Sequence, residues 1–292
     1  MTASLVIDTD IGGEPDDAMA LAIAAHRCPE LALVLTTDEA DGQRARLARW
    51  FLDLLGRPDV PVVAGRRLSS TPYFWVADLI PGDVADQPSG PVGAVAAVCE
   101  RTSGPVRWLG LGPMSNLGDV LDARPDLAHR LVVTQMGGAL AYRDPAQSQY
   151  NFRLDPVAVR TALDAVSRPR LVTYDVTFAP RIAITADSPL YRRLAGSSVP
   201  WAAALVAQCD RYYAGYHPAT IPHTPLALSA ALGEPFVRFD ARQVAVDKIG
   251  RTTLADDGTL VQLSTDADHS GFAEWLYREL SPAIPRPVAP VL

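Results

Sequence analysis

Residues 6–18 read Val6-Ile7-Asp8-Thr9-Asp10-Ile11-Gly12-Gly13-Glu14-Pro15-Asp16-Asp17-Ala18, and this stretch decides the fold. Its apolar start predicts a short buried strand, and the run from Ala18 to Ala25 predicts a helix. A strand, an acidic turn and a helix form the opening of an α/β unit. Because Asp8 and Asp10 alternate with Thr9, they share one face at the carboxyl end of the strand, where open α/β sheets bind ligands.

Five acidic residues lie within ten positions of this turn, and two interpretations of them stay open. Acids in the first turn of a helix interact favourably with its dipole, which accounts for Asp16 and Asp17 as capping residues. Capping does not account for Asp8 and Asp10 at the end of the strand. Hard cations prefer oxygen ligands of this kind, so the alternative is a cation or polyol site.

The chain continues as alternating strands and helices, which is typical of a doubly wound fold. Strands are predicted at Leu31–Thr37, Val60–Gly65, Val106–Gly112, Leu131–Gln135 and Leu171–Thr177, and near Gln243–Val246 and Leu260–Leu263. Helices are predicted at Arg44–Leu55, Pro200–Tyr213 and Ser270–Leu280. We therefore expect an α/β fold with an open, mainly parallel central sheet flanked by helices. The strand after Ser4 should lie near its centre, in a single domain over residues 1–292 with a Pro-rich tail at 282–292.

Composition excludes several classes of function. The net charge of −7 argues against a nucleic-acid or anionic-membrane partner. Lys248 is the only lysine, which nearly excludes a Schiff-base mechanism. Three widely spaced cysteines give neither a zinc pattern nor a disulfide framework, and they indicate a reducing compartment. Without a signal peptide or a membrane-spanning apolar run, the expected location is the cytoplasm.

Residues 69–93 are rich in proline and glycine and include Tyr73, Phe74 and Trp75. Folded segments flank them closely, so a loop over a ligand site is one interpretation. A surface Ω-loop with its own small core is the other.

Five motifs follow one another in a recognisable order. They are Asp8-Thr9-Asp10 with Asp16-Asp17-Ala18, Gly112-Pro113-Met114-Ser115-Asn116-Leu117, Met136-Gly137-Gly138, Asn151 to Pro156, and His223-Thr224-Pro225-Leu226-Ala227. Over about residues 5–280 they resemble the nucleoside hydrolase family (inosine-uridine preferring). The resemblance implies a hydrolase that cleaves the N-glycosidic bond of a ribonucleoside or related N-riboside.

In that family a calcium ion holds a water and the ribose hydroxyls, and an aspartate accepts the proton of the water. The resemblance implies that Asp10 is this base and also a calcium ligand. It implies Asp17, the backbone carbonyl of Ser115 and position Thr224 as further ligands. His223 matches the histidine that protonates the leaving nucleobase in some members.

The resemblance also implies a sugar site and an assembly. Asp16 would hold a ribose hydroxyl, Asn151 and Gln149 would bind the sugar, and Asp38 stands near the position of a substrate-binding Gly-Asn pair. A nucleoside-like small molecule is the implied partner, and a homodimer or homotetramer is the implied state. We predict that Asp10, Asp17, Ser115, Asn151 and His223 converge on one pocket.

Two positions depart from the family pattern. Thr224 replaces an aspartate that ligates calcium, and Gln149 replaces a glutamate. Since cation affinity follows ligand charge, we predict that calcium binds weakly or not at all, unless Glu14 in the expanded turn restores one charge. An altered or inactive protein that binds a ribosyl ligand, and a different reaction in the same pocket, remain the alternative hypotheses.

Overall fold

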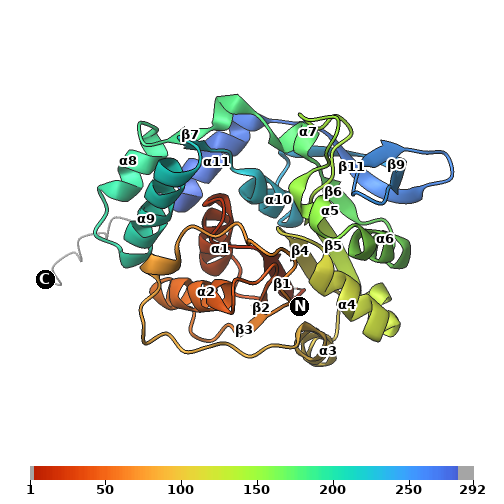
Figure 1. The fold of residues 1–292 in the computed structure, drawn as a ribbon, viewed down its shortest axis with the longest axis horizontal. Coiled ribbons are helices and arrows are strands. Elements are labelled where there is room, and N and C mark those ends of the chain that lie inside the picture. The colour runs from red at the N-terminus through yellow and green to blue at the C-terminus, as the bar shows by residue number, and fades with distance from the viewer. Residues whose placement is uncertain (1–2, 282–292) are drawn as a thin grey trace, which may run out of the picture.

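Strand β1 (Leu5–Thr9) is buried along its whole length and pairs in parallel with β2 on one side and β4 on the other. The computed structural model describes residues 3–281 (Figure 1). It has a nine-stranded sheet in the order β10-β9-β11-β6-β5-β4-β1-β2-β3. The seven strands from β11 to β3 are parallel, whereas β9 runs antiparallel to both of its neighbours, β11 and β10. The predicted open, mainly parallel α/β sheet is confirmed, and β1, which was expected near its centre, is an interior strand that lies third from the β3 edge.

The remaining strands and the helices have the following bounds. The strands are β2 (Leu31–Thr36), β3 (Val62–Ala64), β4 (Val106–Gly110), β5 (Leu131–Met136), β6 (Arg170–Val172), β7 (Ile184–Thr185), β8 (Ala219–Thr220), β9 (Val237–Val246), β10 (Thr252–Leu254) and β11 (Thr259–Ala267). The helices are α1 (Asp16–Arg27), α2 (Gln43–Leu54), α3 (Pro91–Arg101), α4 (Ser115–Ala123), α5 (Tyr150–Leu154), α6 (Pro156–Ala165), α7 (Tyr174–Thr177), α8 (Pro189–Ala195), α9 (Pro200–Gly215), α10 (His223–Ala231) and α11 (His269–Leu280).

Helices cover both faces of the sheet and enclose two hydrophobic cores (Figure 1). Leu5 and Ile7 of β1 face one core, which α1, α2, α9, α10 and α11 complete. Val6 faces the other core, formed with α3, α4 and α6. This alternation along a strand that is apolar on both sides is what a parallel sheet covered on both faces requires.

One predicted strand is shorter than expected. The segment Leu171–Thr177 is a strand only to Val172, and Tyr174–Thr177 forms the short helix α7. The carboxylate of Asp175 accepts hydrogen bonds from the backbone N–H groups of Leu140 and Ala141, at 2.9 and 2.7 Å. These bonds fix the chain in a turn that its alternating apolar pattern did not reveal.

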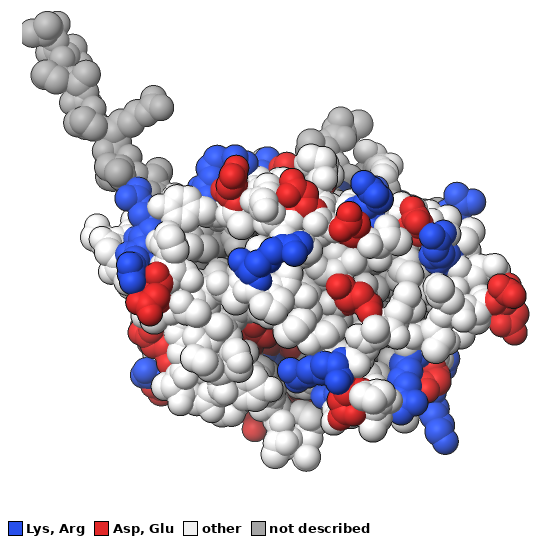
Figure 2. All heavy atoms as spheres, turned by 90° about the horizontal axis from the view of Figure 1, so that it is seen from above, with Lys and Arg blue, Asp and Glu red and all other residues white. Residues whose placement is uncertain are grey.

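The Pro-rich tail at 282–292 lies outside the described residues. Within residues 3–281, every helix is too short or too polar to cross a membrane. On the face shown in Figure 2, arginine and acidic side chains are interspersed rather than gathered by sign.

The acidic turn after β1 depends on glycine at one position. Gly12 has φ +100°, a conformation that side chains with a Cβ rarely adopt. A methyl group at this position would overlap the ring of Phe74, which packs over the turn. The turn can therefore close against residues 69–93 only when residue 12 lacks a side chain.

We expect Gly12→Ala to lower the free energy of unfolding by about 2–4 kcal/mol, because it adds backbone strain to a steric overlap. Gly56→Ala is the matched control, since Gly56 also has a positive φ (+73°) but open space around it. Its expected cost is about 1 kcal/mol. Urea denaturation of both variants decides the matter, and equal losses would show that Phe74 does not constrain the turn.

Candidate active site

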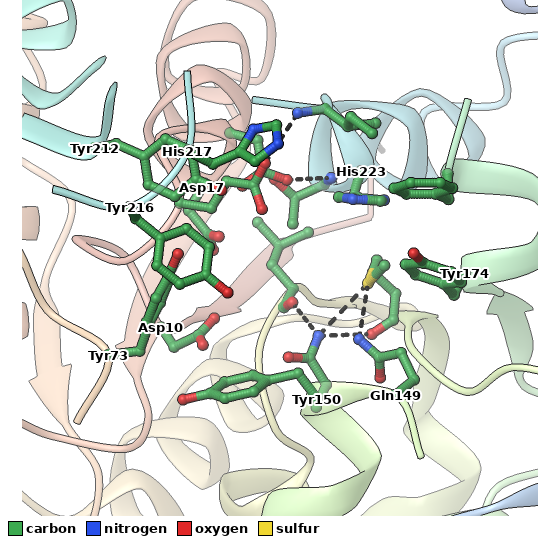
Figure 3. Close-up of a pocket in the computed structure, with 18 of the residues that line it drawn as sticks. Asp10, Asp17, Tyr73, Gln149, Tyr150, Tyr174, Tyr212, Tyr216, His217 and His223 are labelled. Carbon is green, nitrogen blue, oxygen red and sulfur yellow. Dashed lines mark hydrogen bonds between the residues drawn. The ribbon is translucent and has the colours of Figure 1, made fainter. Parts of the chain in front are cut away.

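A pocket with a volume of about 580 Å³ opens at the carboxyl ends of the parallel strands (Figure 3). Its lining comes from the turn after β1, the ends of β4 and β5, α5, α7, and the segments around α9 and α10. The predicted site residues in this lining are Asp10, Asp16, Asp17, Gln149, Asn151, His223 and Thr224. Positions more than two hundred residues apart in sequence therefore share one cavity.

The acids of the turn form the floor of this pocket. The Thr9 hydroxyl donates to Asp17, and the Thr224 backbone N–H donates to Asp16 at 2.9 Å. Both residues lie in the first turn of α1, as the capping interpretation predicted, where the helix dipole favours acids. Their carboxylates also contact other segments of the floor, so capping is not their whole role.

Asp8 lies beneath the pocket rather than in its lining. Its side chain is 1% exposed, and Asn116 Nδ2 donates to its Oδ1 at 2.8 Å. The same amide nitrogen donates to the Thr36 carbonyl at 3.0 Å. Asn116 thereby links the ends of three adjacent strands and fixes the base of the acidic turn.

Burial raises the pKa of every acid in the turn. It raises the pKa of Asp10 to about 6, although the buried Arg44 guanidinium opposes the shift. It raises the pKa of Glu14 to about 7 and holds those of Asp16 and Asp17 well above the ordinary range, with mutual repulsion adding to the effect. Strongly shifted pKa values of this kind cluster at functional sites.

Amide side chains form another part of the pocket. Asn151 Nδ2 donates to the carbonyls of Leu111 and Met136, at 2.6 and 3.1 Å. Gln149 Oε1 accepts from the backbone N–H groups of Gly138 and Phe152, both at 3.3 Å, so this residue also caps α5. These contacts hold both amides in fixed orientations. Asn151 keeps its amide oxygen, and Gln149 its amide nitrogen, for a bound ligand.

Aromatic rings form two walls above the floor (Figure 3). Tyr73 packs against Tyr216 at a centroid distance of 4.9 Å, with Tyr150 and Tyr212 beside them. We call these four residues the tyrosine wall. Since Tyr73 lies in the loop at 69–93 and lines the pocket, the interpretation of that loop as a cover for the site is supported.

The opposite wall consists of Tyr142, Tyr174, Phe178 and His223, which we call the stacked wall. The Tyr174 ring stacks on Phe178 at 4.8 Å and on His223 at 5.8 Å, with interplanar angles of 18° and 21°. His223 Nδ1 and the Thr177 hydroxyl are 2.7 Å apart. Burial, with a further contribution from Arg143, lowers the pKa of His223 to about 4, so its imidazole is neutral at physiological pH.

Two predicted site residues are not in the lining. Ser115 is fully buried as the first residue of α4, away from the cavity. The Asp38 carboxylate accepts from the backbone N–H groups of Leu68 and Ser69, at 3.0 and 2.8 Å, and lies 3.8 Å from Arg44. The Asp38 carboxylate is therefore used to hold the loop at 69–93. The predicted convergence on one pocket is found for Asp10, Asp17, Asn151 and His223, but not for Ser115.

Sequence reasoning missed several residues of the lining. The carbonyl of Leu111, just after β4, meets Asn151 in the pocket where a contribution from Ser115 was expected. A backbone carbonyl leaves no signal in the side-chain pattern. Arg143 and Tyr142 come from a polar segment after β5 that carries no motif, and only their place in the structure identifies them.

The oxygens of the floor suit a hard divalent cation. Asp10 and Asp17 supply carboxylates, and the Thr224 hydroxyl oxygen is buried without a hydrogen-bond partner. Across residues 3–281 no three His, Cys, Asp or Glu side chains are grouped so as to hold a metal ion. The donor chemistry thus fits a cation, provided that neutral oxygens complete its coordination.

Comparison with known proteins establishes the family. The chain matches the family model described as inosine-uridine preferring nucleoside hydrolase over residues 5–274. This match covers most of the chain, so the chain belongs to the inosine-uridine preferring nucleoside hydrolase family. This match confirms the resemblance seen in the motifs, and it identifies the protein as an enzyme that hydrolyses N-glycosidic bonds.

Individual relatives match along nearly their whole length. The pyrimidine-specific ribonucleoside hydrolase RihA of Enterobacter sp. (strain 638) is 26% identical over 314 residues, covering 96% of this chain and 98% of that protein. RihA of Klebsiella pneumoniae (strain 342) is 26% identical over 317 residues, covering 96% and 99%.

Solved structures show the same fold. A plant nucleoside hydrolase, PpNRh1, superimposes with a TM-score of 0.80 at 21% identity, covering 96% of this chain and 99% of that one. The inosine-uridine preferring nucleoside hydrolase from Bacillus anthracis gives 0.77 at 18% identity, with the same coverage. At these identities the likeness concerns the fold alone.

The raised pKa of Glu14 leads to a prediction about stability. Between pH 4.5 and 7 the folded protein keeps a proton on Glu14 that the unfolded chain has released, so this residue makes stability fall as pH rises. Glu14→Gln keeps an oxygen that can accept from Thr220 and Ile221 while removing the charge. From pH 5 to pH 8 the variant should gain on the order of 2 kcal/mol relative to the wild type.

Denaturation of metal-free protein at both pH values measures this difference. Glu274→Gln, on the exposed side of α11, controls for the substitution itself. Parallel pH dependences for wild type and Glu14→Gln would refute a charge penalty at position 14.

Proposed function

We propose that the pocket binds a ribonucleoside with its ribose on the acidic floor and its nucleobase between the aromatic walls. The observation that carries this proposal is the convergence of Asp10, Asn151 and the two walls in one cavity. Aromatic rings suit a flat heterocycle, whereas carboxylates and amides suit sugar hydroxyls. The floor and the walls thus match the two halves of a nucleoside.

Asp10 is the proposed general base. With its pKa at about 6, its carboxylate is ionised at neutral pH and still basic enough to accept a proton. It takes a proton from water as the water oxygen bonds to the anomeric carbon. The electron pair of the breaking C–N bond leaves with the nucleobase. Positive charge that develops on the ribose ring is stabilised by the carboxylates of the floor.

The remaining floor residues are assigned to the sugar and to a cation. Asp16, Asn151 and Gln149 would bind ribose hydroxyls, whereas Asp38 is left out because loop closure occupies its carboxylate. A bound divalent cation, calcium in this proposal, would supply a water of lowered pKa. Asp10, Asp17 and Thr224 would hold that cation, with the Leu111 carbonyl nearby in place of Ser115.

Pyrimidine ribonucleosides are the proposed substrates, because the RihA relatives are named for that specificity and match along nearly their full length. A cytoplasmic location and a homodimeric or homotetrameric state remain predictions, supported by the family resemblance. The proposal is tested with uridine, inosine, adenosine and nicotinamide riboside, each with and without calcium. Failure to hydrolyse any of them would favour the ligand-binding alternative.

We expect Asp10→Asn to lower turnover by on the order of a hundredfold to ten-thousandfold, because an amide cannot accept the proton of water. Steady-state kinetics on the best substrate measures the loss. Asp187→Asn, an exposed member of a surface ion pair with Arg192, is the matched control and should keep full activity. Undiminished turnover by Asp10→Asn would remove this residue from the mechanism.

Thr224→Asp should raise calcium affinity, because it adds a charged oxygen where the wild type offers a neutral hydroxyl. Titration calorimetry after dialysis against a chelator should give weak binding for the wild type and binding tighter by on the order of tenfold for the variant. Thr224→Asn has the same shape without the charge, so it separates charge from geometry. Equal affinities for the Asp and Asn variants would place the cation away from position 224.

A further inference from the structure

Side chains of both charges line the pocket. Four acids line it, and its arginines are Arg143 and Arg153. Arg153 is engaged by Gln147 Oε1 at 2.9 Å, by the Ser148 carbonyl at 3.0 Å and by the Tyr150 ring. Neither arginine forms an ion pair with a carboxylate of residues 3–281, and Arg143 contacts tyrosines of the two walls. Its charge is therefore available to a ligand.

Arg143 is exposed to solvent and contacts one residue of each aromatic wall. Its guanidinium is 5.8 Å from the centroid of the Tyr142 ring, which packs edge-on against Tyr174 at 5.0 Å. Tyr216 of the tyrosine wall interacts with the same guanidinium. The charge is also felt at His223, at the end of the stacked wall. A nucleobase held between these walls would have Arg143 beside it.

Cleavage of an N-glycosidic bond separates charge in a fixed direction. The electron pair of the C–N bond passes to the nucleobase, where its nitrogens and carbonyl oxygens share the negative charge. The complementary positive charge grows on the ribose ring. The acids of the floor match the ribose, but a neutral His223 brings no positive charge to the nucleobase.

We propose that Arg143 is a catalytic residue whose N–H groups donate to the departing nucleobase and stabilise its negative charge. The inference rests on the proposed function. It gives the nucleobase a positive charge, which the acidic floor does not supply and which His223, the motif residue implied at this part of the substrate, does not carry when neutral. Water adds to the anomeric carbon and gives its proton to Asp10, while the nucleobase leaves with the bonding pair. The released nucleobase then takes a proton from solvent, so ribose and neutral nucleobase are the products.

Two substrates with different leaving groups test this role. Uridine must expel a basic uracil anion, whereas p-nitrophenyl β-D-ribofuranoside expels p-nitrophenolate, which is stable without assistance. Arg143→Met removes the charge and keeps much of the apolar bulk. Its kcat on uridine should fall on the order of a hundredfold, the usual cost of a lost charge-stabilising donor, with little change on the p-nitrophenyl substrate. Arg143→Lys should recover part of the loss.

Arg192→Met, at an exposed surface ion pair, is the matched control and should retain wild-type kinetics on both substrates. Thermal melting confirms that each variant is folded. Equal losses on the two substrates, or no loss on either, would overturn the role of Arg143 while leaving the hydrolase intact. A wild-type enzyme that cleaves neither substrate would instead overturn the proposed function, and this inference with it.

Discussion

The active site depends on one buried arginine side chain, that of Arg44. Arg44 of α2 is fully buried, and its guanidinium donates to the backbone carbonyls of Asp10, Ile11, Tyr73 and Asp38. It therefore joins the acidic turn to the loop that carries the tyrosine wall. A buried charge is costly unless it is well paired. Here the carbonyls and the surrounding carboxylates compensate it, and Arg44 in turn opposes the rise in the pKa of Asp10.

The opposing pKa shifts in the pocket have a common physical origin. Burial disfavours charge, so it raises the pKa of Asp10 and Glu14 and lowers that of His223. The carboxylates of the floor are therefore stabilised strongly when a positive charge appears beside them. Holding these carboxylates close together lowers the free energy of unfolding, as is common at functional sites. Charge that develops on the ribose during bond cleavage would relieve this repulsion.

Sequence patterns predicted the sheet, the interior place of β1, and four of five residues expected to converge in the pocket. Hydrophobic periodicity and glycine-rich turns carry the information for the sheet because they act locally, whereas the convergence in the pocket was implied by the resemblance of the motifs to the nucleoside hydrolase family. Ser115 and Leu111 show where it ends, since the direction of a backbone carbonyl follows from the way a strand closes into a helix. Asp38 and Tyr174 show a second limit, because hydrogen bonds formed across loops decide their positions.

The expanded turn and the change at position 224 are connected in space. Glu14 lies in the inserted part of the turn, and its Oε1 accepts from the Thr220 hydroxyl at 2.6 Å and the Ile221 N–H at 2.9 Å. These partners come shortly before Thr224, whose own backbone N–H binds Asp16. The Glu14 carboxylate thus contacts the segment just before α10, the helix that carries Thr224 in place of an acid. In the absence of a cation, a further acid at 224 would therefore add to the mutual repulsion of Glu14, Asp16 and Asp17.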